Sequence, residues 1–221
     1  MRTDINLETI TDGKLYDIDD MAKADTEGCG GCNACCYNSG DLIVLTPFDV
    51  YEIATHMNVT FDALLTDKLN LQPDGKITLP RLKMQGKRQG CNFLNQEGRC
   101  SIHGFRPNIC RLFPLGRVYD NQDFKYFLQV DACVKPNLKL IKVRHWIGIE
   151  NYEENKSFLL AWQQMIKALT FRVKFIHDDE ELKAINDYLI ETFYRQLSTT
   201  KDFYTTFYAK LPEAKKVLGI I

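Results

Sequence analysis

Half of the chain's eight cysteines lie within eight consecutive residues, and this clustering limits what the chain can fold into. The stretch GCGGCNACCY, residues 28–37, contains Cys29, Cys32, Cys35 and Cys36. A chain of 221 residues, 45% of them hydrophobic, can bury a core without cross-links, so stability alone does not call for these thiols. Thiols this close in sequence indicate metal binding or redox chemistry instead.

The first residues, MRTDINLETITDGK, are polar and acidic, unlike the apolar segment of a secretory signal. No stretch of the sequence reaches the roughly 18 apolar residues that a membrane-spanning helix needs. We therefore expect a cytoplasmic protein without a membrane partner, in which thiols stay reduced. Clustered cysteines in that compartment are more typical of metal sites than of disulfides.

Short segments of different periodicity alternate in the first part of the chain. Residues 41–45 have the pattern of a short buried strand, and Thr46 followed by Pro47 is a typical start of a helix. Thr60 is expected to cap a second short helix that extends through Leu69. The other predicted strands are 77–79 and a hairpin in GRVYDNQDFKYFLQV that turns at Asn121 and Gln122.

Cysteines stop before about residue 151, and apolar residues then recur at helical spacing. Asp178 predicts the start of a helix, and a last helix is expected over 202–210 with a separate turn after Pro212. The first helical stripe consists of Leu159, Trp162, Met165, Ile166, Leu169 and Val173. These patterns predict an α+β fold. It would comprise a cysteine-cluster metal-binding domain of short strands and helices, residues 1–150, and a helical C-terminal region, residues 151–221, packed on it.

The spacing of Cys29, Cys32 and Cys35 lets a looped backbone aim successive sulfurs at one point, as in tetrathiolate zinc sites and cubane iron–sulfur clusters. The intervening glycines permit left-handed backbone and can turn N–H groups toward sulfur. Cys35 and Cys36 are adjacent, so we expect their side chains to diverge and not to bind one small ion together. Further ligands would come from Cys91, Cys100, Cys110 and Cys133. Two four-coordinate sites, or one cluster and a redox pair, fit the number of thiols equally.

The combination of CGGCNACC, CNFL, GRCSIHGFRPNICRLFP and a late cysteine resembles the CxxCxxCC cysteine-cluster family, whose zinc- or iron-chelating members are also called YkgJ-like. The resemblance covers about residues 28–136, and LTPFDVYEIA is similar to the family's strand and helix after the cluster. It implies metal chelation, with an iron–sulfur cluster as the expected cofactor and zinc as the alternative. Family relatives include proteins similar to the flagellin lysine methylase, so an enzymatic role stays open.

Carried over residue by residue, the resemblance implies one set of cofactor-binding and metal-binding positions. They are Cys29, Cys32, Cys35, Cys36, Cys91, Cys100, Cys110 and Cys133. Arg106 and Pro107 match the family's RPxxC element. His103 follows Cys100 at a spacing that zinc sites use, but the family pattern has an aromatic residue there, so we do not expect it to be a ligand.

Positive charge is concentrated between Arg81 and Arg117, where eight basic residues accompany one acid, Glu97. An anionic partner would suit such a segment. We favour a solvated surface or compensation of nearby thiolates, with Arg106 and Arg111 as thiolate neighbours of Cys110. A nucleic-acid partner is therefore not expected.

Common catalytic motifs are absent from the sequence, among them GxGxxG, GxxxxGK[ST], GxSxG and HExxH. The pattern C-x2-C-x2-CC also departs from the C-x3-C-x2-C of radical S-adenosylmethionine enzymes. The sequence therefore names no catalytic residue and leaves open whether the protein is an enzyme.

Three functions remain in competition. The favoured one is a metal-binding protein that holds an iron–sulfur cluster and has a redox or group-transfer role, methyl transfer included, toward an unknown protein or small-molecule partner. The second is a zinc-binding structural or interaction module with closed thiolate sites. The third is metal storage or delivery by labile, exposed thiolates.

Overall fold

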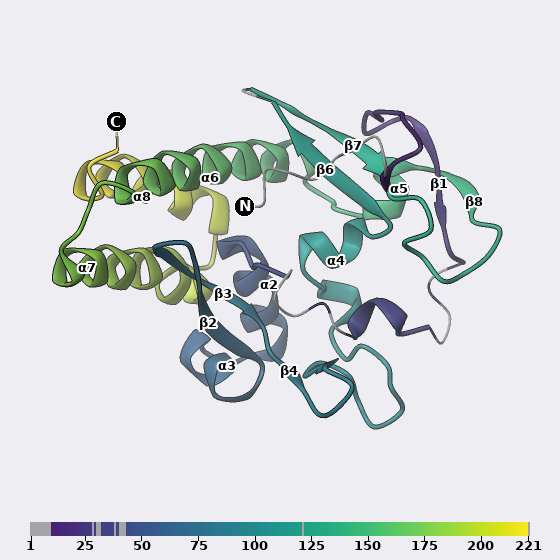
Figure 1. The fold of residues 1–221 in the computed structure, drawn as a ribbon, viewed down its shortest axis with the longest axis horizontal. Coiled ribbons are helices and arrows are strands. Elements are labelled where there is room, and N and C mark those ends of the chain that lie inside the picture. The colour runs from purple at the N-terminus through teal and green to yellow at the C-terminus, as the bar shows by residue number, and fades with distance from the viewer. Residues whose placement is uncertain are drawn as a thin grey trace.

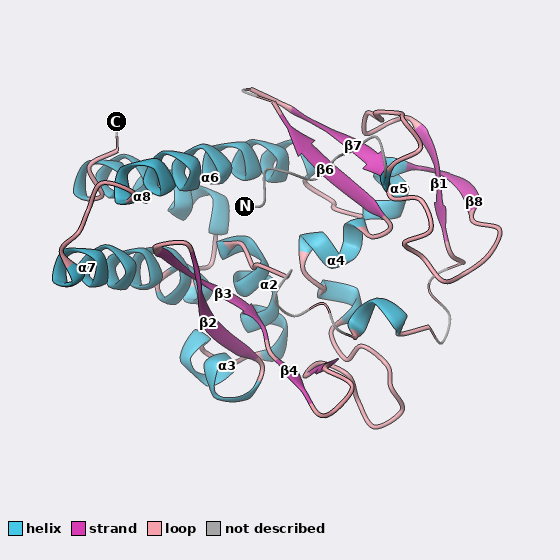
Figure 2. Cartoon of the chain, in the orientation of Figure 1, coloured by secondary structure: helices cyan, strands magenta, loops and turns pink. Residues whose placement is uncertain are grey.

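The computed structural model describes residues 10–27, 29, 32–37, 39, 43–120 and 122–220. Long helices gather at one end of the molecule, while short strands and loops form the other end (Figure 1). The strands form small two-stranded sheets, each antiparallel (Figure 2). The mixed composition confirms the predicted α+β fold with a cysteine-rich part and a helical C-terminal part.

The helices of the described residues differ widely in length. The α-helices are α2 (Pro47–Met57), α3 (Phe61–Asp67), α4 (Asn108–Leu112), α5 (Val143–Ile147), α6 (Tyr152–Val173), α7 (Asp179–Ile190) and α8 (Phe203–Val217). Shorter turns are the 3-10 segments η1 (Ala34–Cys36), η3 (His103–Phe105) and η5 (Leu197–Thr199) and the π-helical segment η4 (Glu191–Arg195).

Three of the sheets are hairpins between neighbouring strands. They pair β2 (Leu69–Asp74) with β3 (Ile77–Leu82), β4 (Met84–Gln85) with β5 (Gly90–Cys91), and β6 (Leu115–Tyr119) with β7 (Phe124–Leu128). Strand β3 contains the predicted strand 77–79, and β6 with β7 confirms the predicted hairpin. Its turn is described only in part, because residue 121 lies outside the described residues.

The fourth sheet joins segments that are far apart in the sequence. Strand β1 (Met21–Asp25) pairs with β8 (Lys139–Lys142), and Asp25 lies opposite Lys139. The chain leaves this sheet shortly before Cys29 and returns to it shortly after Cys133. The two ends of the cysteine-containing segment are therefore held side by side.

The predicted helix starts are confirmed by their capping contacts. Thr46 caps α2 in a capping box with Asp49, Thr60 accepts a hydrogen bond from Ala63 N, and Asp178 caps α7. The helix expected through Leu69 instead ends at Asp67, and Leu69 begins β2.

Two further local predictions differ from the structure. Helix α8 continues through Pro212, where a helix end and a separate turn were expected. Burial of Ala214 and Leu218 on the same face offsets the hydrogen bond that a proline inside a helix cannot make. Of the strand expected at 41–45, residues 41 and 42 lie outside the described residues, and Val44 makes an isolated bridge to Arg81.

A continuous hydrophobic core connects the helical end with the cysteine-rich part. Every member of the predicted α6 stripe is buried. Phe48 at the start of α2 contacts Phe158 of α6 and both Phe203 and Tyr204 of α8, with ring centroids 5.1 to 6.2 Å apart. Tyr194 is fully buried and donates a hydrogen bond of 2.9 Å to the Leu45 carbonyl. The start of α2 is thus fixed by the C-terminal helices.

No helix in the described part of the chain has the length and apolar character that crossing a bilayer requires.

Candidate metal centre

Five thiols from four separate segments of the chain are gathered near one another. Cys35 and Cys36 belong to η1, Cys91 ends β5, Cys100 lies in the following loop, and Cys110 belongs to α4. We call these the five-thiol group.

Their influence on one another's pKa shows that they share one environment. Burial raises the pKa of Cys110, and the charges of Cys91, Cys35 and Cys100 raise it further. Burial also raises the pKa values of Cys91 and Cys100, and Cys35 adds to both. Each thiolate thus makes its neighbours harder to ionise, as expected for sulfurs that lie near one another.

The adjacent cysteines Cys35 and Cys36 do not diverge, contrary to the expectation from their sequence. The Cys36 thiol donates a hydrogen bond to the sulfur of Cys35. The tight turn of η1, closed by hydrogen bonds from Cys36 N to Asn33 O and from Tyr37 N to Ala34 O, brings the two sulfurs together. That hydrogen bond, helped by Arg106, lowers the pKa of the exposed Cys35 to about 6 and raises that of Cys36.

The segment between Cys91 and Cys100 is a closed loop, which fixes the two sulfurs relative to each other. Leu94 forms a bridge with Cys100, and its N–H donates to the Cys91 carbonyl over 2.9 Å. Ser101 donates through both its N–H and its hydroxyl to the Phe93 carbonyl. These hydrogen bonds come from the backbone and from the Ser101 hydroxyl, and none of them uses a cysteine side chain.

Two asparagines attach this loop to its surroundings. Asn33, between Cys32 and η1, donates to the Gly98 carbonyl over 3.0 Å. Gly98 has φ +71°, and a Cβ there would lie 2.8 Å from the Asn33 amide nitrogen, so only glycine fits the contact. Asn92 donates to the Asp67 carbonyl over 2.6 Å and accepts at its own carbonyl from Lys68.

A buried carboxylate holds the segment of Cys110. Asp49 of α2 accepts hydrogen bonds from the N–H and the side-chain amide of Asn108, at 2.7 and 3.1 Å. Its other oxygen accepts from the N–H and hydroxyl of Thr46, both at 2.8 Å. Burial raises the pKa of Asp49, and these hydrogen bonds oppose the rise. Helix α4, with Cys110 two residues after Asn108, is thereby tied to the start of α2.

The basic residues near the group have separate roles. Arg106 lowers the pKa values of Cys35 and Cys100, so its charge acts on these two thiols, whereas it was expected beside Cys110. Arg111 instead donates to the carbonyls of Arg106 and Gly104, at 3.0 and 2.6 Å, and so supports the turn before α4. The side chain of His103 forms a hydrogen bond with Arg106, and burial together with this guanidinium lowers its pKa.

Cys29 and the segment of Cys133 meet at a different point, Thr26. The sulfur of Cys29 lies 3.0 Å from the Thr26 hydroxyl, and Lys135 donates to the Thr26 carbonyl over 3.2 Å. Pairing of β1 with β8 explains this approach. Cys29 itself has φ +55°, while Gly28, Gly30 and Gly31 lie outside the described residues, so their expected conformations are not tested.

Within the described residues, no three side chains of the types His, Cys, Asp and Glu already stand in an arrangement that could hold a metal ion. The electrostatic coupling of the five thiols acts over longer distances than coordination does. Among the described residues, the five thiols therefore act on one another's charge without forming a closed metal site.

The comparison with protein families agrees with the cysteine pattern. Residues 28–133 match the CxxCxxCC family model, described as "Putative zinc- or iron-chelating domain". This segment, just under half of the chain, is therefore similar to the CxxCxxCC family. The match begins just before Cys29, ends at Cys133 and so includes all eight cysteines, which confirms the resemblance inferred from the sequence and supports metal binding. No curated protein and no solved structure matches the chain.

Sequence reasoning did not identify Asp49, Asn33 and Asn92 as residues that shape the site. Asp49 was visible only as an acid in the first turn of a helix. Its contact with Asn108 joins residues 59 positions apart, which no local pattern reveals. The position of Asn92 directly after Cys91 was a weak indication of its role. A buried amide next to a metal-binding residue commonly orients that residue.

We expect Asp49→Asn to destabilise the protein by about 1–3 kcal/mol, because the new amide cannot accept from at least one buried donor. Asp62→Asn is the matched control, since Asp62 is also in the first turn of a helix but is exposed and bonded to Arg195. It should change stability by less than about 1 kcal/mol. Urea unfolding of the metal-free proteins measures both. Equal losses in the two variants would contradict the role of Asp49.

In metal-free protein, Cys35 should form its thiolate as the pH rises through about 6. Iodoacetamide labelling of Cys35, followed by peptide mass spectrometry from pH 5 to 9, should therefore rise with a midpoint near that value. Cys36→Ala removes the hydrogen-bond donor and should move the midpoint upward, toward the ordinary thiol value. A midpoint that Cys36→Ala leaves unchanged would show that the two thiols do not interact in solution.

Proposed function

We propose that the five-thiol group binds an iron–sulfur cluster and that the protein uses it in a redox or group-transfer reaction. The observation that carries this proposal is the gathering of five thiols, one of them exposed, from four segments of a region similar to the CxxCxxCC family. General metal binding is supported by the family match, and the identity of the metal and the reaction are the proposed part.

The chemistry of the donor set fits such a cofactor. Sulfur donors suit zinc and iron–sulfur clusters and are poor ligands for magnesium or calcium. Burial and mutual repulsion raise the pKa values of Cys91, Cys100 and Cys110, so these thiols ionise readily only when a cation compensates them. Binding would then release protons and draw the loops together.

The number and exposure of the thiols favour a reactive centre over a purely structural one. A closed structural zinc site uses four ligands, whereas five thiols are gathered here. Cys91 is only 7% exposed, but Cys35 is open to solvent. One position of the group is thus accessible to a substrate or a partner protein.

The chain's own residues would prepare the site. Cys35 is already close to its thiolate form, Asp49 fixes the segment of Cys110 through Asn108, and the positive charge of Arg106 offsets the negative charge of the sulfurs. Hydrogen bonds of Asn33 and Asn92 hold the loop that carries Cys91 and Cys100 in place. An iron–sulfur cluster bound there would supply one-electron transfer or an open iron for substrate ligation.

The remaining cysteines form a second set in this proposal. Cys29 and the segment of Cys133 meet at Thr26, and Cys32 follows Cys29 in a turn in which Cys32 N donates to Cys29 O over 2.9 Å. We propose that these cysteines either bind a second metal or exchange electrons with the metal bound by the five-thiol group. Methyl transfer is the group transfer suggested by the resemblance, and its partner would be a protein or a small molecule.

Anaerobic purification with analysis of iron, zinc and acid-labile sulfide tests the proposal directly. We expect iron with sulfide in comparable amounts and a visible absorption band that dithionite bleaches. Colourless protein with stoichiometric zinc and no sulfide would replace the iron–sulfur proposal by a zinc site. Protein that holds neither metal would contradict both.

Serine substitutions then assign the ligands. Cys100→Ser and Cys110→Ser should each lose most of the metal, whereas Ser101→Ala, which removes the neighbouring hydroxyl but no thiol, should keep it. Cys133→Ser should affect metal content less than Cys100→Ser, because it belongs to the second set. Equal loss in Cys100→Ser and Cys133→Ser would mean that the two sets act as one site.

A further inference from the structure

A cavity of about 350 Å³ opens beside the five-thiol group. It is open to solvent, and its lining includes Cys91, the aromatic ring of Tyr37 and the aliphatic side chain of Leu94. The remaining rim is the turn of the β4–β5 hairpin, where Lys87 and Arg88 are exposed. A volume of this size is typical of small-molecule sites.

The shape of this cavity depends on a close approach of two segments. Tyr37, directly after Cys36, forms an isolated bridge with Gly90, directly before Cys91. A Cβ at Gly90 would lie 3.0 Å from the ring of Tyr37. Glycine thus lets the ring approach the strand closely. The cavity is therefore bounded by residues adjacent to two members of the five-thiol group.

The charged residues that line the cavity are all basic. Lys87 and Arg88 are basic, Gln85 and Asn95 contribute amides, and none of the described residues that line the cavity is acidic. The guanidinium of Arg88 lies 5.9 Å from the centre of the Tyr37 ring, which keeps it over the cavity. These two residues belong to the basic stretch between Arg81 and Arg117, which the thiolates do not fully account for.

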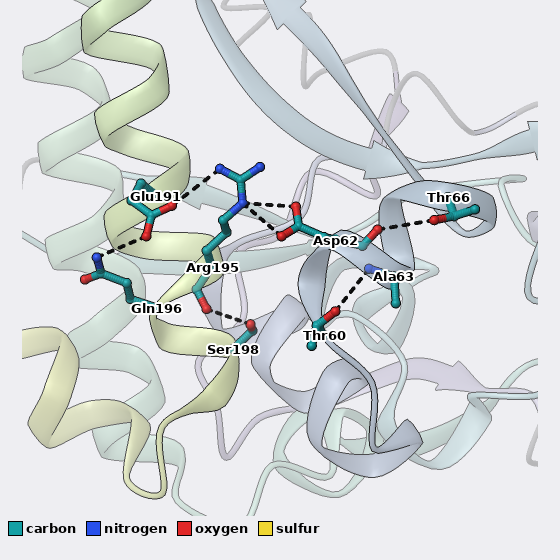
Figure 3. A network of polar contacts seen from close by, with 8 residues as sticks. All are labelled: Thr60, Asp62, Ala63, Thr66, Glu191, Arg195, Gln196 and Ser198. Carbon is teal, nitrogen blue, oxygen red and sulfur yellow. Dashed lines mark hydrogen bonds and ion pairs between the residues drawn. The ribbon is translucent and has the colours of Figure 1, made fainter.

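A larger cavity of about 750 Å³, between the β2–β3 hairpin and α7, is a weaker candidate. Its charged residues are already paired with one another or with neighbours. Lys183 bonds to Asp187 over 2.5 Å, and Arg195 bonds to both Asp62 and Glu191 (Figure 3). An anion would have to compete with these carboxylates, whereas the smaller cavity presents its cations without an acid in its lining.

We propose that the cavity beside Cys91 binds a small anion, a carboxylate or a phosphate, with Lys87 and Arg88 as its charge partners. The anion lies between the hairpin turn and Tyr37, beside Cys91. The proposal rests on the proposed function for its purpose, since it makes the cavity the substrate entrance of the metal centre. The binding itself depends only on the cavity and its charges.

Isothermal titration of the purified protein with pyrophosphate and, separately, with citrate tests this assignment. At least one probe should bind saturably, and the double variant Lys87→Gln/Arg88→Gln should weaken that binding by about 10-fold or more, because two charge-assisted contacts are lost. Lys215→Gln/Lys216→Gln, on the last turn of α8, removes the same charge far along the chain and should change the affinity less than about twofold. The probe that binds better identifies the anion class.

Absence of saturable binding for both probes, or equal weakening by both double variants, would overturn the proposal. Metal and sulfide content measured on the same samples separates it from the proposed function. A Lys87→Gln/Arg88→Gln variant with normal metal but lost anion binding supports both proposals. Anion binding without any metal in the wild type would leave the cavity in place and contradict the metal centre alone.

Discussion

The carboxylate of Asp49 connects the helical part of the molecule with the segment that carries Cys110. It is buried, caps its own helix through Thr46 and accepts two hydrogen bonds from Asn108. A buried carboxylate with several donors is costly to disturb, because buried donors such as those of Asn108 would lose an acceptor. The position of α4, and with it one sulfur of the five-thiol group, follows from this arrangement.

The rest of the structure supports that connection from both sides. Phe48 and Leu45 fix the start of α2 against α6, α8 and Tyr194. The helical region therefore sets the position of Asp49. On the other side, Asn33 and Asn92 attach the loop of Cys91 and Cys100. The thiols are thus carried by short segments whose positions are set by hydrogen bonds to residues other than cysteine. Such a scaffold can keep sulfurs near one another before a metal binds.

The sequence predicted the helix starts and the buried face of α6 because both depend on residues that are close together in the chain. Thr46, Thr60 and Asp178 cap helices through residues two or three positions away, and the α6 stripe repeats within one helix. The continuation of α8 through Pro212 was not predictable, since distant packing outweighs the local preference.

The candidate site was predictable in composition but not in arrangement. The cysteine spacing predicted the family similarity that residues 28–133 show, and it led to the proposal that sulfur atoms are the donors. Convergence of Cys35 and Cys36 depends on a 3-10 turn that their adjacency does not encode. The approach of Cys29 and the Cys133 segment to Thr26 depends on pairing of β1 with β8. Asp49 and Asn108 are 59 residues apart, so their contact belongs to the tertiary structure alone.

In the proposed centre, sulfur atoms of the five-thiol group bind the metal. X-ray absorption at the iron and zinc edges of anaerobically purified protein tests it most directly. The account predicts a nearest shell made only of sulfur, at about 2.3 Å if the metal is zinc, and a further shell of iron neighbours if it is an iron–sulfur cluster. A nearest shell of nitrogen or oxygen atoms, as His103 or the surrounding carboxylates would give, would contradict it.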